Sequence, residues 1–330
     1  GRCANVRRRA RNVGTRAADA SARLMSRAAR AEAMRPSAHA EKNLKRDLGD
    51  WPNREFSRFV HAAGFDWHVQ VAGRGPVLLL VHGAGAATHS WRDLFPMLAR
   101  HYKVVAVDLP GHGFTDTVGS SQASVAGMAL ALSRLLRVLQ AEPDYAVGHS
   151  AGAAILVRMC LDGLIAPKAI MAINGAFKPF GGLAAQIFSP LAKALSLNPF
   201  VPRLFAWSVS SPDSVSRLIR DTGSRLDHRG LGLYGRLFGD PRHVSGALRM
   251  MANWDLTKLG AEMAGLRVPL TLVVAAGDRA VPPAQGEEIA AATPGASLVR
   301  VARLGHLAHE EDPKAFASLI EAMAKAHPVA

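Results

Sequence analysis

Short apolar runs rich in β-branched residues alternate with Ala- and Leu-rich stretches from Trp51 onward, and this alternation restricts the fold more than any other feature. A wholly apolar run such as 77-VLLLV-81 is typical of a strand buried on both faces. A longer stretch such as 124–140 has the apolar spacing of a helix. The predicted strands lie within 68–73, 76–83, 103–113, 144–150, 168–175, 269–278 and 297–306. The pattern predicts an α/β fold with a mainly parallel, twisted sheet and flanking helices.

One interval interrupts this alternation. Between Ala176 and Arg267 the sequence has helical patches punctuated by Pro and Gly, without a strand-like run. A structureless insertion of about ninety residues would be unusual inside such a domain, whereas an inserted helical unit beside a ligand site is a common arrangement. We therefore expect a core formed by 51–177 and 268–330, and a helical cap formed by 178–267.

Positive charge is concentrated near the N-terminus. The formal net charge of the 330 residues is +14, and residues 1–50 account for +8 of it, so the remaining body is only mildly basic. This distribution gives no reason to expect nucleic-acid binding. Residues 1–50 are poor in large apolar side chains and are predicted to be a disordered extension. Residues 1–42 resemble a transit peptide in composition, and the alternatives are a disordered extension or translated sequence upstream of a start at Met25 or Met34.

The sequence also disfavours several classes of protein. Cys3 and Cys160 are the two cysteines, so we expect no disulfide framework and a reducing, cytoplasmic location. No spacing of Cys, His, Asp and Glu suggests a metal site, and the G-x-G pieces at 83–85 and 111–113 lack the rest of a dinucleotide motif. No metal ion, other cofactor or transmembrane segment is expected. Peripheral contact with a membrane stays open.

Polar residues with catalytic potential directly follow four of the predicted strands. His82 and Gly83 follow the run ending at Val81, and Ser150, Asp278 and His306 follow three later runs. Because open parallel sheets place their chemistry outside the carboxyl ends of the strands, these side chains should meet at one edge. The order along the chain is Ser, Asp, His.

Ser150 lies at the centre of 148-GHSAG-152, where glycines allow a sharp turn from strand to helix. Such a turn would lift the serine hydroxyl above the sheet. His306 would accept the hydroxyl proton, and Asp278 would orient the imidazole and stabilise its cation. The predicted donors of an oxyanion hole are the amides of Ala84 and Ala151.

Two neighbouring positions compete with this assignment. His309 lies three residues after His306, but together with the acids at 310–312 it has the pattern of a polar first turn of a helix. An alternative acid position follows the strand that ends at Ile173, but Asn174 occupies it and has no carboxylate. Two further histidines are expected to shape the site without reacting: His82 and His149.

The glycine-flanked turn at Ser150, known as a nucleophile elbow, and the order Ser, Asp, His along the chain resemble the α/β-hydrolase superfamily. The stretch 108-DLPGHGFTD-116 is similar to the D-x-P-G-x-G-x-S loop of that superfamily, with Thr115 at the usual Ser position. The chain more closely resembles the α/β-hydrolase-like magnesium chelatase accessory proteins of bacteriochlorophyll biosynthesis. The resemblance implies a photosynthetic bacterium, a role beside the enzyme that inserts Mg²⁺ into protoporphyrin IX, and chelatase subunits as partners, without implying a defined reaction. The segments that carry it are 51–70, 82–99, 147–155, 173–182, 188–207, 250–256 and 304–313.

Two functional hypotheses remain. In the first, the chain is a serine hydrolase that acts on an ester or related carbonyl of a tetrapyrrole or another lipophilic molecule. In the second, it is a non-catalytic porphyrin-binding or chelatase-interacting accessory protein on a hydrolase scaffold. A complete set of Ser150, Asp278 and His306 favours the first, since a pure binder needs none of them. Aromatic side chains in or beside the cap could line a pocket for a flat macrocycle, although core packing explains any single one equally well: Phe177, Phe180, Trp207 and Trp254.

Overall fold

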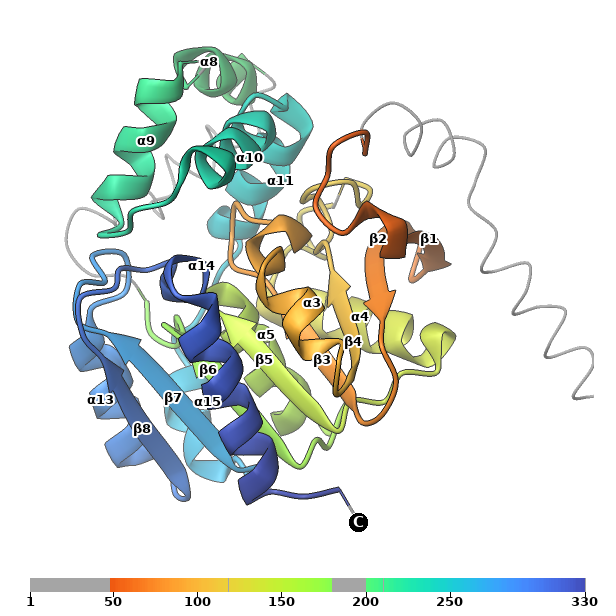
Figure 1. Ribbon diagram of the computed structural model, residues 1–330, viewed down its shortest axis with the longest axis vertical. Helices are drawn as coiled ribbons and strands as arrows, with labels where there is room; N and C mark the ends of the chain where they lie inside the picture. The colour runs from red at the N-terminus through yellow and green to blue at the C-terminus, as the bar shows by residue number, and fades with distance from the viewer. Residues whose placement is uncertain (1–47, 118, 180–199, 210, 330) are drawn as a thin grey trace, which may run out of the picture.

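An eight-stranded sheet forms the centre of the computed structural model, which describes residues 48–117, 119–179, 200–209 and 211–329 (Figure 1). The strand order is β1-β2-β4-β3-β5-β6-β7-β8. The pairs β1–β2 and β2–β4 are antiparallel and all other pairs are parallel, so the predicted α/β fold with a mainly parallel sheet is confirmed. The strands are β1 (Ser57–Ala62), β2 (Phe65–Ala72), β3 (Val77–Val81), β4 (Lys103–Val107), β5 (Tyr145–His149), β6 (Ala169–Ile173), β7 (Leu270–Ala275) and β8 (Ala296–Val301).

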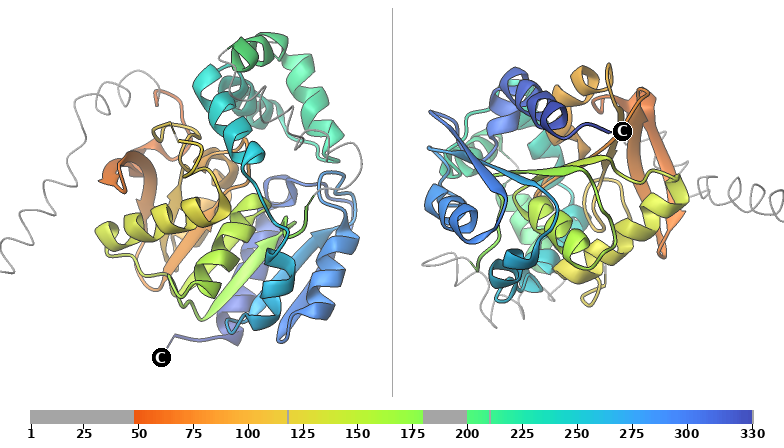
Figure 2. Two further views of the ribbon diagram at one scale, coloured as in Figure 1. Left: turned by 180° about the vertical axis from the view of Figure 1, so that it is seen from behind. Right: turned by 90° about the horizontal axis from the view of Figure 1, so that it is seen from below.

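Helices cover both faces of this sheet (Figure 2). On one face lie α4 (Val125–Leu139), α5 (Ala151–Leu161) and α13 (Pro283–Ala292), and on the other lie α3 (Leu94–Leu98) and α15 (Pro313–Ala326). Burying one Val, Leu or Ile side chain stabilises the fold by about 1.5–3 kcal/mol. This gain explains why the central strands, which are covered on both faces, carry apolar side chains on both sides. The short helices of the core are η1 (Arg54–Phe56), η2 (Thr88–Trp91) and α14 (Ala308–Glu311).

In the described part of the interval between β6 and β7, helices α8 to α11 lie beyond one end of the sheet (Figure 1). The last two helices, α12 and η3, pack beside the sheet, with Leu259 and Met263 in the main core cluster. Serine or aspartate side chains cap the first turns of α9, α10 and α11 by accepting amide hydrogen bonds. Proline occupies the first helical position of α9 and α11, so prolines that punctuate the sequence begin helices here. The helices are α8 (Phe200–Ser208), α9 (Pro212–Asp221), α10 (His228–Phe238), α11 (Pro241–Ala252), α12 (Leu259–Glu262) and η3 (Met263–Gly265).

Some elements differ from the sequence-based expectation. Strand β1 was not predicted, and it exists because its residues pair with β2 in a hairpin. β7 and β8 end at Ala275 and Val301, a few residues before Asp278 and His306, so both of these residues lie in the loops that follow the strands. Most of the predicted N-terminal extension lies outside the described residues, but Leu48 is described and is buried beside Trp51. No helix in the described ranges is long and apolar enough to cross a membrane.

Candidate active site

Ser150 occupies the turn between β5 and α5 in a strained conformation, with φ of 51° and ψ of −116°. Such backbone strain is rare for a residue other than glycine and is concentrated at functional sites. The flanking glycines are required by close approaches, since a Cβ on Gly152 would collide with the Val81 carbonyl and one on Gly148 with the backbone of Ala153. The side chain is therefore held at the carboxyl end of the sheet, where it is 8% exposed.

Asp278 and His306 come from the loops after β7 and β8 and meet through a hydrogen bond. His306 Nδ1 lies 2.8 Å from Asp278 Oδ2, so the imidazole donates its Nδ1 proton and keeps Nε2 free to accept another. The other carboxylate oxygen of Asp278 accepts the amides of Ala280 at 2.8 Å and Val281 at 2.9 Å. The carboxylate is thus fixed on both oxygens and orients the ring.

The contact between serine and histidine is not formed in this structure. Within the described residues, the Ser150 hydroxyl makes no hydrogen bond. Ser150 and His306 nevertheless both follow strands of the sheet at its carboxyl edge. Catalytic hydrogen bonds are often long in the absence of substrate and shorten only in the reacting complex. Proton transfer from Ser150 to His306 therefore stays a prediction.

The loop after β3 touches the serine. A Cβ on Gly83 would lie 3.0 Å from the Ser150 Cβ, so only a glycine allows this approach without movement. Ala84 follows in the same turn and is exposed. Ala151 is the first residue of α5, and its amide has no acceptor within the helix. Both predicted oxyanion donors thus belong to segments that border Ser150, and their catalytic role stays a prediction.

Two polar side chains hold the backbone of the proposed base. Asn174 Nδ2 donates to the carbonyls of Gly305 at 3.1 Å and His306 at 2.9 Å, while its Oδ1 accepts the Ala275 amide at 2.9 Å. His149 Nε2 lies 2.9 Å from the same His306 carbonyl. Sequence reasoning noted Asn174 only as a position without a carboxylate, and its supporting role comes from contacts that no local pattern reveals.

His309 does not contact the acid. Its Nε2 lies 2.7 Å from Ser90 Oγ, and its ring packs 4.6 Å from that of Trp91. Burial lowers the pKa of His309 to about 3. The expected polar first turn is therefore only partly correct, because His309 and Glu310 lie in a short helix but are both buried.

Glu310 forms a buried ion pair with Arg92, and the Tyr234 hydroxyl donates to its other oxygen at 2.7 Å. Burial alone would lower the Arg92 pKa, but the adjacent carboxylate raises it above its ordinary value. Burial disfavours the charged form of the carboxyl group too, and it therefore raises the pKa of Glu310. These three residues come from the segment after η2, from α14 and from α10, so the pair joins the core to the cap.

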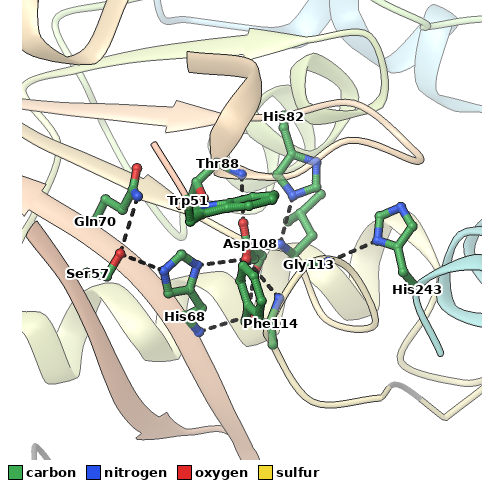
Figure 3. A network of polar contacts seen from close by, with 12 residues as sticks. Trp51, Ser57, His68, Gln70, His82, Thr88, Asp108, Gly113, Phe114 and His243 are labelled. Atoms are coloured by element: carbon green, nitrogen blue, oxygen red, sulfur yellow. Dashed lines mark hydrogen bonds and ion pairs between the residues drawn. The ribbon is translucent and has the colours of Figure 1, made fainter. Parts of the chain in front are cut away.

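The 108–116 loop is organised by a fully buried aspartate, Asp108 (Figure 3). Its Oδ2 lies 2.7 Å from His68 Nδ1 and accepts the Phe114 amide at 2.9 Å, while Oδ1 accepts the Thr88 amide at 2.6 Å. Burial alone would raise the Asp108 pKa, but these partners lower it below its ordinary value. Thr115 uses its hydroxyl to donate to the Asp108 carbonyl at 2.7 Å, which is a local role for the Thr in the motif.

His82, like His149, uses its ring to hold the backbone of loops near Ser150. The Leu109 amide donates to His82 Nε2 at 3.0 Å, so this ring carries its proton on Nδ1 and donates to the Gly83 carbonyl at 2.7 Å. Burial lowers the pKa of His82, which favours this neutral form. The ring thereby joins the 108–116 loop to the loop that touches Ser150.

The three predicted aromatic residues that the structure describes do not line one pocket surface together. Phe177 is 1% exposed and belongs to the main core cluster, so its position is that of a packing residue. Trp207 is 77% exposed on α8. Trp254 packs against the core cluster, and its buried Nε1 has no hydrogen-bond partner. Phe180 lies outside the described residues.

The described residues contain no group of three or more His, Cys, Asp or Glu side chains placed to hold a metal ion. Cys160 is a free thiol, and burial raises its pKa to about 12. A thiol with so high a pKa is a poor nucleophile at neutral pH.

Comparisons with known proteins agree with this architecture. The model of the alpha/beta hydrolase family matches residues 78–319. The chain is 37% identical to the magnesium-chelatase 30 kDa subunit of Rhodobacter capsulatus, over 79% of this chain and 92% of that protein. An alpha/beta hydrolase fold protein from Burkholderia ambifaria superposes with a TM-score of 0.65 at 25% identity, covering 80% of this chain and 98% of the other. The enol-lactonase from Burkholderia xenovorans gives a TM-score of 0.66 at 20% identity, covering 81% and 99%, and shows the fold alone.

Proposed function

This chain belongs to the alpha/beta hydrolase family, and we propose that it is a serine hydrolase with Ser150 as nucleophile, His306 as base and Asp278 as the acid that orients the base. One observation carries the proposal. The strained serine turn and the 2.8 Å hydrogen bond between His306 and Asp278 lie at the same edge of the sheet. A protein that only binds a ligand gains nothing from keeping a serine in a conformation that costs about 1–3 kcal/mol.

The reaction that these residues support is acyl transfer. Ser150 Oγ adds to a carbonyl carbon while His306 Nε2 takes the hydroxyl proton, and the Ala84 and Ala151 amides stabilise the oxyanion. Collapse breaks the bond to the alcohol, which leaves with the proton from His306. Water then attacks the acyl-enzyme, gives its proton to His306, and releases the acid with regeneration of Ser150.

The substrate class is proposed from the relative. A protein named for magnesium chelatase matches over 79% of this chain. An ester or related carbonyl of a tetrapyrrole, or of another lipophilic molecule of the same biosynthesis, is therefore the substrate we propose. Chelatase subunits are the proposed partners, and peripheral association with a membrane remains a proposal that goes with a lipophilic substrate.

The relative's name also supports a second candidate. A protein called a subunit can act by contact, so a non-catalytic accessory role, in which the chain binds a porphyrin or the chelatase, is the alternative. A hydrolase fold does not by itself imply hydrolysis. The two candidates differ in whether Ser150 is needed for function.

A fluorophosphonate probe tests the nucleophile directly. We expect the folded wild type to be labelled on Ser150, with no labelling in Ser150→Ala and a fall of at least about 100-fold in His306→Ala, because the base that activates the hydroxyl is gone. His309→Ala is the matched control, since that histidine does not contact Asp278. An unlabelled wild type, together with a Ser150→Ala variant that restores pigment synthesis in a deletion strain, would contradict the hydrolase proposal and favour the accessory role.

Titration with protoporphyrin IX and its magnesium complex tests the substrate class separately. Saturable quenching of tryptophan fluorescence at micromolar concentration would support a tetrapyrrole site, corresponding to a binding free energy of about 8 kcal/mol. Ester hydrolysis without any such binding would retain the hydrolase and reject the tetrapyrrole.

A further inference from the structure

Among the cap side chains that contact the core loops, His243 of α11 is a buried one that makes hydrogen bonds, and Figure 3 shows its contact with Gly113. His243 is 1% exposed. The Gly113 amide donates to its Nδ1 at 3.0 Å, so that nitrogen carries no proton. The proton is therefore on Nε2, which lies 3.1 Å from the Gly85 carbonyl and donates to it. One neutral imidazole thus joins two core loops to the cap.

A second contact shows that α11 rests directly on one of these loops. Gly246 lies one turn after His243 on the same helix face, and a Cβ there would collide with the Gly111 carbonyl. The helix backbone can approach the loop this closely only because residue 246 is a glycine. Burial lowers the pKa of His243 to about 4, so the ring stays neutral at pH 7 and keeps the tautomer that both contacts require.

The Gly85 carbonyl matters because it belongs to the turn that contains Ala84. Core residues already hold this turn at its two ends: His82 binds the Gly83 carbonyl, and Asp108 accepts the Thr88 amide. Gly85 lies between these points with φ of 75°, in a turn that the Ala86 amide closes by donating to the Gly83 carbonyl at 3.2 Å. The Gly85 carbonyl takes no part in that bond and is held by a partner outside the turn. His243 is that partner.

We propose that His243 is a positioning residue that fixes the oxyanion-hole amide of Ala84 by holding the Gly85 carbonyl from the cap. The inference rests on the proposed serine hydrolase function. It adds that the cap takes part in transition-state stabilisation through its own hydrogen bond, besides covering the site. Because the oxyanion exists only after attack, loss of this contact should lower kcat while changing KM little.

Two conservative variants separate the two contacts of the ring. In His243→Gln the side-chain amide nitrogen lies where Nε2 lies, so it can still donate to Gly85 but cannot accept from Gly113. In His243→Asn the side-chain oxygen lies where Nδ1 lies, so it can still accept from Gly113 but cannot reach Gly85. The experiment measures kcat and KM for a p-nitrophenyl ester, together with the rate of fluorophosphonate labelling, on the full chain.

We expect His243→Asn to lower kcat by about 10- to 100-fold, with KM within about twofold, since removal of an oxyanion donor costs about 100- to 1000-fold and a misplaced donor should cost less. His243→Gln should retain at least about one third of the wild-type kcat. His228→Asn on α10 is the matched control, because that histidine is exposed, and it should behave as wild type.

The proposal is overturned if His243→Asn keeps the wild-type kcat, or if Asn and Gln lose activity equally, since the Gly85 contact would then not be the one that matters. Should His243→Asn fail to fold, His243→Met replaces it, because it preserves much of the volume without donating or accepting, and a wild-type kcat in this variant also overturns the proposal. A wild type that neither hydrolyses esters nor reacts with the probe contradicts the proposed function itself, which is a distinguishable result.

Discussion

At the scale of single residues, an Asp-His-Ser hydrogen-bonded array occurs outside the proposed site as well. His68 Nδ1 lies 2.7 Å from Asp108 Oδ2, and His68 Nε2 lies 2.9 Å from Ser57 Oγ (Figure 3). Ser57, however, begins a β-strand, its own amide donates to the Arg54 carbonyl, and the strand pairs with β2. It lacks the strained turn and the helix N-terminus that Ser150 has. The Gln70 side-chain nitrogen beside it already donates to the Pro52 carbonyl at 2.7 Å and to Ser57 Oγ at 3.3 Å, so it is not free to stabilise an oxyanion.

We therefore expect a fluorophosphonate to react with Ser150 and to leave Ser57 unmodified. In Ser150→Ala the labelled fraction should fall at least about 100-fold, because the array around Ser57 supplies a base but no oxyanion donors. Peptide mass spectrometry after labelling identifies the modified serine. Probe bound to the peptide that contains Ser57 would show that proton acceptance alone activates a serine in this fold.

The residues of the proposed triad could be predicted from the sequence because each follows an apolar run, and the carboxyl ends of parallel strands share one edge. The supporting residues could not. Asn174 binds carbonyls more than a hundred residues away, and His243 acts from the cap. A single polar residue within a helical pattern carries no signal of a partner that only tertiary structure supplies.

At the scale of elements, the strands buried on both faces were predicted most closely. β3 and β6 are continuous apolar runs, and β5 is buried along its whole length although it ends in His149. β1, in contrast, is partly exposed and mixes charged with apolar residues, so it gave no clear pattern. The cap helices could be expected as a group, but their limits depend on side-chain caps such as Asp227 and Asp240. The contacts between the cap helices and the core join residues that are far apart in the sequence, so no local pattern predicts them.

The ion pair between Arg92 and Glu310 joins three elements, and its removal should be costly. We expect Glu310→Gln to lower the free energy of unfolding by about 3 kcal/mol, because Arg92 is 5% exposed and would lose its buried carboxylate partner. It would keep two more exposed carboxylates, Asp93 at 3.3 Å and Asp227 at 3.9 Å, which compensate its charge only in part. The double variant Arg92→Met, Glu310→Leu removes both charges and should recover part of this loss, leaving the buried Tyr234 hydroxyl unpaired at a cost of about 1–3 kcal/mol.

Urea unfolding of the single variants Arg92→Met and Glu310→Leu and of the double variant gives the coupling energy, and the same measurement on Glu310→Gln gives the loss expected above. A matched control is Arg300→Met, which removes an exposed pair with Glu287 and should change stability by less than about 1 kcal/mol. If Glu310→Gln costs no more than this control, the pair is solvated in solution and does not join cap to core.

At the scale of the whole molecule, the described residues include an unusual set of buried histidines. Burial is the largest cause that lowers the pKa of six of them: His82, His89, His112, His149, His243 and His309. They lie in or beside the loops around the proposed site and in α11. The rings of His82 and His243 each make two hydrogen bonds, those of His112, His149 and His309 make one each, and that of His89 makes none with the described residues. The polar network that positions the site thus depends on these rings staying neutral.

This set predicts that the protein loses stability in mild acid. Each of the six has a lower pKa folded than unfolded, so the unfolded chain binds the proton first, and their contribution is complete above about pH 6.5 and is lost as pH falls. Each histidine should then reduce the free energy of unfolding by about 1.4 kcal/mol per pH unit until its folded pKa is reached, about 4 for His243 and about 3 for His309. The raised pKa of Glu310 acts in the opposite direction, but it is one group against six.

Calorimetry between pH 7.5 and pH 5, at about half-unit steps, should show a steep fall in Tm with uptake of several protons on unfolding. His61→Gln is the control at an exposed histidine, and it should leave that slope unchanged. A Tm that stays flat across this range would mean that the buried rings become protonated in the folded protein at little cost, and the neutral tautomer assigned to His243 would then have to be abandoned.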